Sequence, residues 1–380
     1  PSPPLPPPPP PFPPPLPAPP PPPPRTRSRC CRSRRPPGYR SSCRSASFEV
    51  AGRDLGFSPA DRRDIVLAGV REYREQLREA SRMRTLDAWY AHLDEEAIHE
   101  GISQAVRRNR LGKKEAREAR RDMAKARTRD SVRVLARRAG EVEGELRIVR
   151  DPPIITPIED LLLSAETRER AEESIRQLLA RYRQTLAHDH HPIEEFRYVH
   201  MARKVVGVGS VGTRCWILLM LGRDNTDPLF LQAKEAQPSV LEAFAGRSRL
   251  RHHGERGVVA QRLMQAASDI FLGWLRVTDL DGQARDYYIR QFHDWKGSVE
   301  VETMRVPGMT LYARMCGATL ARAHARWGDR IAIGAYLGPG EVFDRAVADF
   351  SAVYADQNER DYEALVQAVK SGRIPAEIGV

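Results

Sequence analysis

The spacing of the apolar residues changes after Pro192, and this change constrains the fold more than any other feature of the sequence. Before it, apolar residues recur every three or four positions, which is typical of amphipathic helices. After it come three short runs rich in β-branched and aromatic residues, separated by glycine-rich and turn-forming segments. These runs cover 196–206, 213–221 and 229–236. The pattern predicts an α+β fold in which they form a three-stranded antiparallel meander.

Helices are predicted on both sides of this meander. Ser58 and Pro59 have the pattern of an N-cap followed by a first helical residue, and helical spacing continues for about 23 residues. A second helix is predicted from Thr85 toward Ile98. Further elements are predicted as helices over 113–138, 160–186, 257–272, 308–326 and 341–370, and as a strand over 287–292.

Two tryptophans are expected in the core rather than on a surface that stacks nucleic-acid bases. Trp216 lies on the second predicted strand, and Trp274 is expected to close the helix that begins near residue 257.

Residues 1–47 have a composition that cannot build a core. The first 24 residues contain 19 prolines, and eight arginines follow without an acidic residue. Such a segment can adopt polyproline II but has no apolar periodicity to bury. We expect a disordered tail. It is either a ligand for aromatic-lined domains or a mis-called or frame-shifted start, because GC-rich coding sequence read in the wrong frame yields Pro, Arg, Ser and Cys.

Charge, cysteine content and hydropathy exclude several classes of partner. The net charge is +11, but without the eight tail arginines 53 basic residues face 50 acidic ones, a balance of +3. These charges alternate as on solvated helix surfaces, so nucleic-acid binding is not expected. Only Cys215 and Cys316 lie outside the tail, and no run of eighteen apolar residues exists. We therefore expect a reducing, cytoplasmic setting and no membrane partner.

A glycine-rich loop joins the first two predicted strands. Gly207, Gly209 and Gly212 form a Gly-x-Gly-x-x-Gly pattern that also contains Ser210. Glycines let backbone amides approach phosphate oxygens, because no β-carbon blocks them. A dinucleotide fold needs a helix after the third glycine and a P-loop needs a lysine there, but this sequence continues as a strand. Strand, glycine loop and strand is the arrangement found in protein kinases.

Lys234 lies on the third predicted strand, one hairpin beyond the glycines. In kinases, a lysine at this place reaches the α- and β-phosphates and is held by a carboxylate from a helix. Glu242 and Glu255 are the candidate partners, although the following helix offers no obvious inward glutamate. The alternative is an ordinary lysine at the edge of a hairpin. Together, the glycines and Lys234 predict a site for the phosphates of a nucleotide.

Five segments carry a resemblance to the bacterial domain-of-unknown-function family 2252. They are 205–216, 232–239, 261–274, 320–326 and 354–361. The resemblance covers residues 48–380. It implies a fold similar to protein kinases and aminoglycoside phosphotransferases in permuted order, with ATP and Mg²⁺ as cofactors and an unidentified acceptor.

The chain departs from the pattern of that family near its start. In the family, a Gly-Asp-x-His-x-x-Asn loop and a later Asp-Phe-Asp segment lie upstream of the matching part, and neither occurs in this sequence. Phosphoryl transfer relies on Mg²⁺ and on a positioned carboxylate. The resemblance therefore implies that this chain binds nucleotide weakly and turns over poorly or not at all.

Three other polar groups have competing interpretations. The segment 188–191 contains three histidines that could bind a metal, but a solvated loop is the commoner outcome. His324 is expected to be a cation at the carbonyl end of a helix. Asp356 and Asn358 have a spacing that could place two oxygens near a metal or ligand, with simple helix-surface exposure as the alternative.

The whole sequence predicts an α+β, protein-kinase-like fold with two lobes. Its parts are the tail 1–47, a helical part of the large lobe over 48–192, the sheet lobe over 193–305 and a second helical part over 306–380. Three functions remain open. The first is an ATP-dependent phosphotransferase whose catalytic loop is missing from this chain. The others are a catalytically silent nucleotide-binding or regulatory module, and a helical interaction protein without nucleotide.

Overall fold

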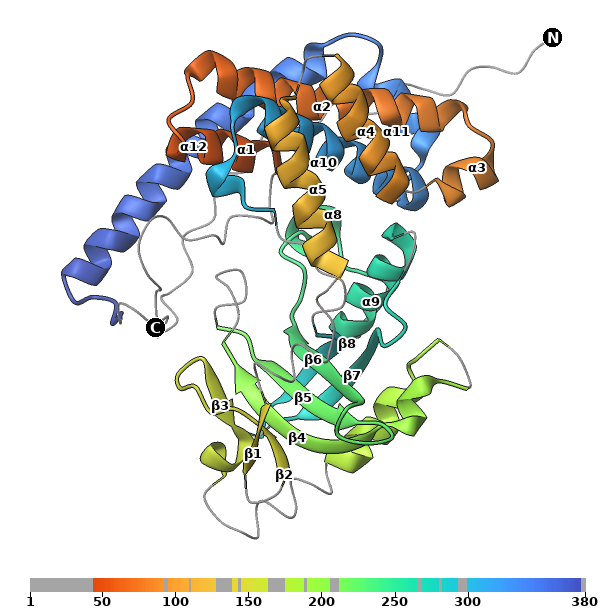
Figure 1. Ribbon diagram of the computed structural model, residues 1–380, viewed down its shortest axis with the longest axis vertical. Coiled ribbons are helices and arrows are strands. Elements are labelled where there is room, and N and C mark those ends of the chain that lie inside the picture. The colour runs from red at the N-terminus through yellow and green to blue at the C-terminus, as the bar shows by residue number, and fades with distance from the viewer. Residues whose placement is uncertain are drawn as a thin grey trace.

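The computed structural model describes residues 44–91, 95–108, 111–127, 139–142, 145–162, 175–187, 190–205, 212–265, 268–279, 282–292 and 299–376. Most of its helices gather in one layer, and an antiparallel sheet forms the other part of the molecule (Figure 1). The helix α9 (His253–Met264) packs on the sheet and also contacts α10 (Val306–Trp327) of the helical layer. The predicted α+β class is confirmed.

The sheet has six antiparallel strands within the described residues, in the order β3-β4-β5-β6-β8-β7. The strands are β3 (Ile155–Pro157), β4 (Arg197–Lys204), β5 (Cys215–Leu221), β6 (Pro228–Ala236), β7 (Gly273–Thr278) and β8 (Ala284–Gln291). The predicted meander is confirmed as β4, β5 and β6, and the sheet extends beyond it on both sides. A separate hairpin joins β1 (Ala139–Val142) and β2 (Glu145–Ile148).

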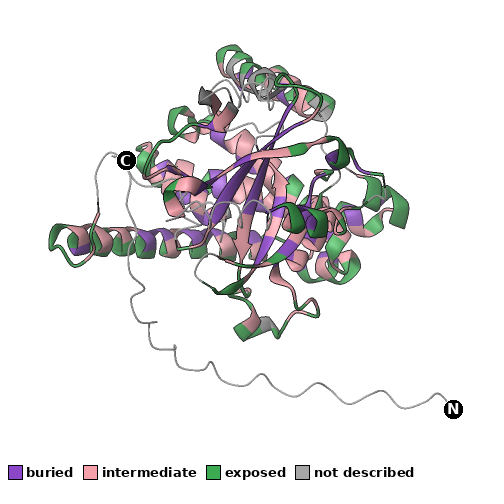
Figure 2. Cartoon of the chain, turned by 90° about the horizontal axis from the view of Figure 1, so that it is seen from below, coloured by how far each residue is buried: buried purple, intermediate pink, exposed green. Residues whose placement is uncertain are grey.

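Every residue of β5 is buried, because both faces of the sheet are covered (Figure 2). On one face, Trp216 packs in a core that includes Tyr182 from the helical residues 175–183. On the other face, Ile217 packs in a core that includes Ile148 of the hairpin. Trp216 is therefore a core residue, as predicted.

The helix α9 lies on the second of these faces, beside β7 and β8. The guanidinium of Arg262 lies 5.9 Å from the centre of the Trp274 ring. At the other end of α9, the backbone N–H of His253 donates to Asp286 Oδ2 at 2.7 Å. The helix is thus fixed across the sheet at both of its ends.

The helical layer is built around the pair α2 (Pro59–Arg82) and α10. Ser58 caps α2 as predicted, since its Oγ accepts from the backbone N–H of Asp61 at 3.1 Å. A β-carbon added to Gly317 of α10 would lie 2.2 Å from the carbonyl oxygen of Gly69 in α2. The two helices therefore approach each other as closely as they do only because glycine occupies this position.

The remaining helices surround this pair or join it to the sheet. They are α1 (Arg44–Asp54), α3 (Thr85–Tyr90), α4 (Glu95–Arg107), α5 (Lys113–Arg127), α8 (Glu242–Ala245), α11 (Arg330–Leu337) and α12 (Val342–Lys370). Short 3-10 turns cover Ile158–Leu161, Pro192–Glu195 and Val301–Thr303. The predicted helices over 308–326 and 341–370 are confirmed as α10 and α12, whereas α11 was not predicted.

The predicted helix over 257–272 is wrong at both ends. It starts earlier, at His253, and stops at Met264, so Trp274 does not close a helix but lies on β7. A β-carbon on Gly273 would lie 2.7 Å from the Tyr182 ring, so the chain passes this ring as an extended strand that begins with glycine. The predicted helix over 160–186 is a 3-10 turn at Ile158–Leu161 and a helix at 175–183, and 163–174 lie outside the described residues.

The start of the folded part differs slightly from the predicted boundary between residues 47 and 48. The helix α1 begins at Arg44, and the Phe48 ring packs edge-on against Tyr312 with centroids 5.8 Å apart. Residues 1–43 lie outside the described residues. Among the helices that the structure describes, none has the length and apolar character needed to cross a bilayer.

Candidate functional site

The register of the sheet places Lys234 beside the first residue of β5, the strand that follows the glycine-rich segment in the sequence. Lys234 of β6 pairs with Cys215, the first residue of β5, and on its other side with Tyr288 of β8. Successive side chains of a strand alternate between faces, so these three directly opposed residues share one face of the sheet. Lys234 therefore lies in the row of residues closest to the loop that connects β4 to β5.

Only the last glycine of the predicted loop is among the described residues. Gly212 has a φ of 82°, in the left-handed region that favours glycine. Gly207, Gly209 and Ser210 lie outside the described residues. Their predicted role in phosphate binding stays a prediction.

Lys234 is half-buried, and no carboxylate of the described residues pairs with it. Within the described part of the chain, it forms no ion pair with an acidic residue. Burial, together with the nearby guanidinium of Arg290, lowers the pKa of Lys234. The same burial raises the pKa of the Cys215 thiol, an effect that the charge of Lys234 opposes. A partly desolvated ammonium with a cationic neighbour favours an anionic ligand.

Arg290 adds a second cation to this face. It pairs with Gln232 in the β6–β8 register, one row further along the same face as Lys234. Its Nε is buried and has no hydrogen-bond partner. Arg290 was not among the predicted site residues. The alternation of side chains along the predicted strand 287–292 indicates which face of the sheet Arg290 lies on. Only the register of β6 and β8 shows that it lies next to Lys234.

Neither predicted partner forms an ion pair with Lys234 within the described residues, so both assignments are wrong. Glu242 accepts from Arg256 Nη1 at 3.0 Å, which ties α8 to α9. Glu255 lies in the first turn of α9, where its backbone N–H donates to His252 Nδ1 at 3.2 Å. The helix starts earlier than predicted, and its residue nearest the sheet at this end is Gly254, which packs against the carbonyl of Tyr287. No glutamate of α9 contacts Lys234.

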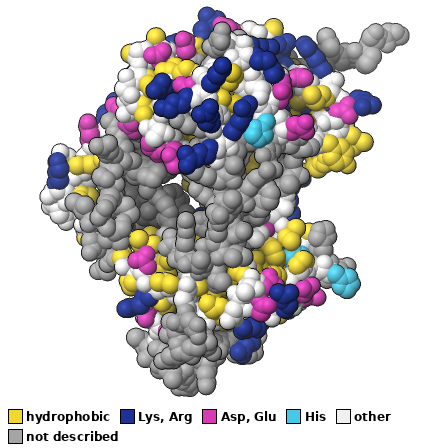
Figure 3. Space-filling model, in the orientation of Figure 1, with side chains coloured by type: hydrophobic (Ala, Val, Ile, Leu, Met, Phe, Trp, Pro, Cys, Tyr) yellow, Lys and Arg dark blue, Asp and Glu magenta, His cyan; other side chains and the backbone are white. Residues whose placement is uncertain are grey.

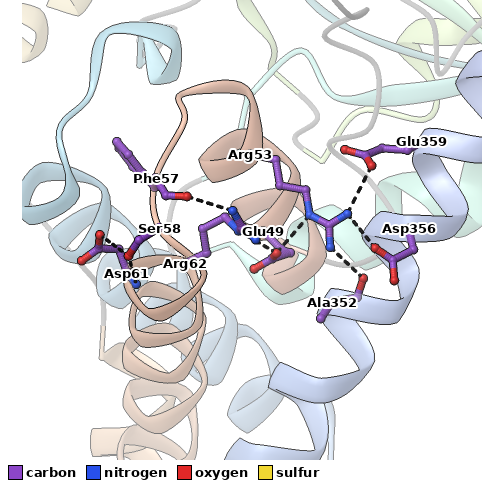
Figure 4. A network of polar contacts seen from close by, with 9 residues as sticks. All are labelled: Glu49, Arg53, Phe57, Ser58, Asp61, Arg62, Ala352, Asp356 and Glu359. Carbon is purple, nitrogen blue, oxygen red and sulfur yellow. Dashed lines mark hydrogen bonds and ion pairs between the residues drawn. The ribbon is translucent and has the colours of Figure 1, made fainter.

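Asp356 and Asn358 do not form one ligand pair. Asp356 accepts from Arg53 Nη1 at 2.7 Å, in a network that joins α1 to α12 and includes Glu49 and Glu359 (Figure 4). Asn358 is buried, and its Oδ1 has no hydrogen-bond partner. Residues two positions apart on a helix face different directions. The hypothesis that their oxygens share a ligand is therefore wrong.

One histidine of the segment 188–191 has a structural role in the described residues. His191 accepts from the N–H of Ile193 through Nδ1 at 3.1 Å, and its Nε2 lies 2.9 Å from the carbonyl oxygen of Ile270. His188 and Asp189 lie outside the described residues. In the part of the chain that is described, no cluster of His, Cys, Asp and Glu has an arrangement that could hold a metal ion.

His324 lies in the last turn of α10, as predicted, but its surroundings disfavour the predicted positive charge. Its Nδ1 lies 2.9 Å from the hydroxyl of Tyr73, and its ring packs edge-on against the Tyr73 ring. Burial lowers the pKa of His324, because the charged imidazolium loses hydration inside the protein. The neutral ring is therefore the form that the fold favours.

An apolar cavity of about 390 Å³ lies on the face of the sheet opposite to Lys234. Trp216 and Leu218 line it, and Asp279 borders it. Asp279 is already satisfied, since it accepts from the Tyr287 hydroxyl at 2.8 Å and pairs with Arg214 Nε at 2.9 Å. This cavity offers no unpaired charge to a phosphate and is distinct from the Lys234 face.

Comparison with known proteins gives one match. The model of a family described as uncharacterised proteins conserved in bacteria, DUF2252, matches residues 44–368. A search of curated proteins and a search of solved structures both found no match.

Proposed function

This chain belongs to the DUF2252 family of proteins conserved in bacteria, and from that premise we propose that it is a kinase-like, ATP-binding domain of a phosphotransferase. The observation that carries the proposal is the position of Lys234. It is half-buried, has no carboxylate partner in the described residues, and pairs across the sheet with the first strand residue after the glycine loop. Cations held in this way bind phosphate oxygens through charge-assisted hydrogen bonds.

The order of elements supports a kinase-like small lobe. A hairpin with a glycine loop (β4 and β5), a strand with a lysine (β6), and a helix that packs on the sheet (α9) follow one another in the chain. Protein kinases use these parts in the same order to hold the phosphates of ATP. We propose that the sheet with α9 is the small lobe and that the helical layer belongs to the large lobe. The permuted order of the two lobes is part of the same proposal.

The residues around Lys234 fit phosphate groups but not a metal ion. Lys234 and Arg290 are cations, and the uncharged residues beside them are Gln232, Cys215 and Tyr288. Mg²⁺ prefers carboxylate oxygens and water, and the described residues bring no carboxylate to Lys234. We therefore propose phosphate binding by this face and derive no step in which a metal takes part.

A second candidate is a nucleotide-binding module that performs no transfer. The specific observation in its favour is that Glu242 pairs with Arg256 and Glu255 does not reach Lys234. In active protein kinases, the ion pair between this lysine and a helix glutamate must be formed. The free thiols of Cys215 and Cys316 fit a reducing, cytoplasmic setting for either function.

Titration calorimetry with ATP, AMP and adenosine tests the proposal. Because Lys234 and Arg290 recognise phosphates, ATP is expected to bind more tightly than AMP, and adenosine is expected to bind weakest. Arg290→Gln is expected to lower the affinity for ATP by about tenfold, which corresponds to the loss of one charge-assisted hydrogen bond. Equal affinity for ATP and adenosine, or no binding of any of the three, would contradict the proposal.

A further inference from the structure

A groove of about 490 Å³ lies in the helical layer, formed by residues of α2, α4 and α10. None of its lining residues belongs to the sheet, so it is separate from the Lys234 face. One wall is apolar and includes Ile98 and Ile102 of α4 and Leu311 and Met315 of α10. Three of the four charged residues that line the groove are arginines.

Two arginines of α10 face the groove with a small residue between them. Arg314, Ala318 and Arg322 are spaced by four residues, which places them along one side of the helix. Ala318 carries only a methyl group, so the space between the two guanidinium groups is not filled from α10 itself. The helix thus presents two cations along one groove.

Within the described residues, no hydrogen bond and no ion pair holds these guanidinium groups. Neither Arg314 nor Arg322 forms an ion pair with a carboxylate within the described residues. The Nη1 of Arg322 is buried and has no hydrogen-bond partner. Buried donors are nearly always satisfied in folded proteins, because an unpaired one is costly. Because Arg314 and Arg322 line the groove without an ion pair in the described residues, their guanidinium groups leave hydrogen-bond donors for a ligand.

The charge of the groove is also unbalanced. Arg108, Arg314 and Arg322 line it against a single carboxylate, Glu72, which accepts from Gln76 Nε2 at 3.2 Å. Burial raises the pKa of Glu72 even though both arginines of α10 oppose that rise. Lys and Arg side chains also gather over the helical layer on the face shown in Figure 3. The groove therefore has an excess of positive charge beside an apolar wall.

Space for a ligand remains at the centre of the apolar wall. A β-carbon added to Gly101 of α4 would meet no heavy atom within 4 Å. A larger side chain at this position is expected to point into free volume and to fill part of the groove without displacing the protein.

We propose that this groove binds a small organic anion, in which a phosphate or carboxylate group contacts Arg314 and Arg322 and a compact apolar group contacts Ile102 and Leu311. The site is independent of the nucleotide site proposed above. Inorganic phosphate matches only the charged half of the groove, and an uncharged ring matches only the apolar half. A molecule with both parts is expected to bind more tightly than either.

Titration calorimetry of the full chain with phenyl phosphate and benzoate, and with inorganic phosphate and phenol for comparison, tests this proposal. At least one of the two aromatic anions is expected to bind more tightly than both comparison compounds, and the tighter one identifies the preferred head group. Arg322→Gln is expected to lower the affinity for that anion by about tenfold. Glu72→Gln is expected to strengthen the binding of that anion, because it removes the one carboxylate among the described residues that line the groove.

Two further variants separate a specific groove from general attraction to a basic surface. Gly101→Leu is expected to abolish binding by filling the groove while the far-ultraviolet circular dichroism stays unchanged. Arg345→Gln removes the same charge from an exposed position on α12 and is expected to leave the affinity unchanged. The proposal is overturned if neither aromatic anion binds, if Arg345→Gln weakens binding as much as Arg322→Gln, or if Gly101→Leu has no effect.

Discussion

Lys234 and Cys215 lie directly opposite each other in the antiparallel pairing of β5 and β6, at the strand ends that adjoin the glycine-rich loop. This relationship places a half-buried ammonium beside a buried thiol, and the guanidinium of Arg290 helps to lower the pKa of that ammonium. Within the described residues, the charge of Lys234 is not neutralised by a carboxylate of the protein itself, and such surroundings favour an anionic ligand. The expected pKa of Lys234 follows from this burial and from the nearby Arg290.

The first prediction concerns the titration of Lys234. Its pKa in the folded chain is expected to lie below the ordinary lysine value of about 10.4, because burial and Arg290 both disfavour the ammonium. Arg290→Gln removes the repulsion and is expected to move the pKa of Lys234 upward. The measurement is the pH dependence of acetylation at Lys234 by competitive labelling and mass spectrometry. A midpoint at or above the ordinary value in the parent would contradict the account of this face.

The second prediction concerns a buried ion pair that joins α2 to α12. Arg74 Nε and Nη2 each lie 2.9 Å from an oxygen of Asp344, and both side chains are almost inaccessible to solvent. Arg74→Met leaves the Asp344 carboxylate buried and unpaired, so it is expected to lower the free energy of unfolding by about 3–5 kcal/mol. Denaturant unfolding measures this loss.

A matched control for that loss connects the same two helices. Arg63 Nη1 lies 2.7 Å from Asp349 Oδ1, but both side chains are exposed. Arg63→Met is therefore expected to cost less than about 1 kcal/mol. Similar losses for Arg63→Met and Arg74→Met would show that the burial of the Arg74 pair is not as described.

The third prediction concerns the close approach of α2 and α10. Gly317→Ala places a β-carbon 2.2 Å from the backbone oxygen of Gly69, which cannot rotate away as a side chain can. The helices must separate, and we expect a loss of about 1–3 kcal/mol in the free energy of unfolding. Gly308→Ala is the control in the same helix, because its β-carbon meets nothing within 4 Å. It is expected to be neutral or to stabilise by about 0.4–1 kcal/mol. Equal effects of the two substitutions would contradict the described packing.

The fourth prediction concerns pH and His324. Burial lowers its pKa in the folded state, so below the unfolded value of about 6.5 the unfolded chain binds more protons at this site than the folded chain. His324 therefore contributes stability above the unfolded pKa, and this contribution is lost as the pH falls through the folded pKa. The loss of stability between pH 7 and pH 5 is expected to be smaller in His324→Gln than in the parent. A larger loss in the variant would restore the interpretation of His324 as a stabilising helix-end cation.

Much of the fold could be predicted from local patterns. The strands β4, β5 and β6 are continuous apolar runs between turn residues, and Ser58 and Pro59 mark the start of α2 in the usual way. The strand β7 was missed, because the apolar run through Phe271 and Trp274 reads equally well as the end of a helix. Only the packing of Gly273 against Tyr182 decides in favour of a strand.

The candidate site could be predicted only in part. The position of Lys234 on a strand follows from its sequence, but its neighbours depend on strand register and on the point where α9 begins. The cap of α9 is His252, which is not a typical capping residue, so the helix was predicted to start too late. Arg290 was overlooked for a different reason, because only the register of β6 and β8 brings it next to Lys234.

Thermal unfolding of the full chain with and without Mg·ATP tests the central proposal most directly. A ligand that binds only the folded state stabilises it by about 2.7 kcal/mol at a hundredfold excess over its dissociation constant. We expect Mg·ATP to raise the unfolding midpoint of the parent and of Lys113→Met, which removes an exposed lysine from α5, and to raise that of Lys234→Met much less. An equal rise in all three proteins, or no rise in the parent, would contradict the proposal that Lys234 binds the phosphates of a nucleotide.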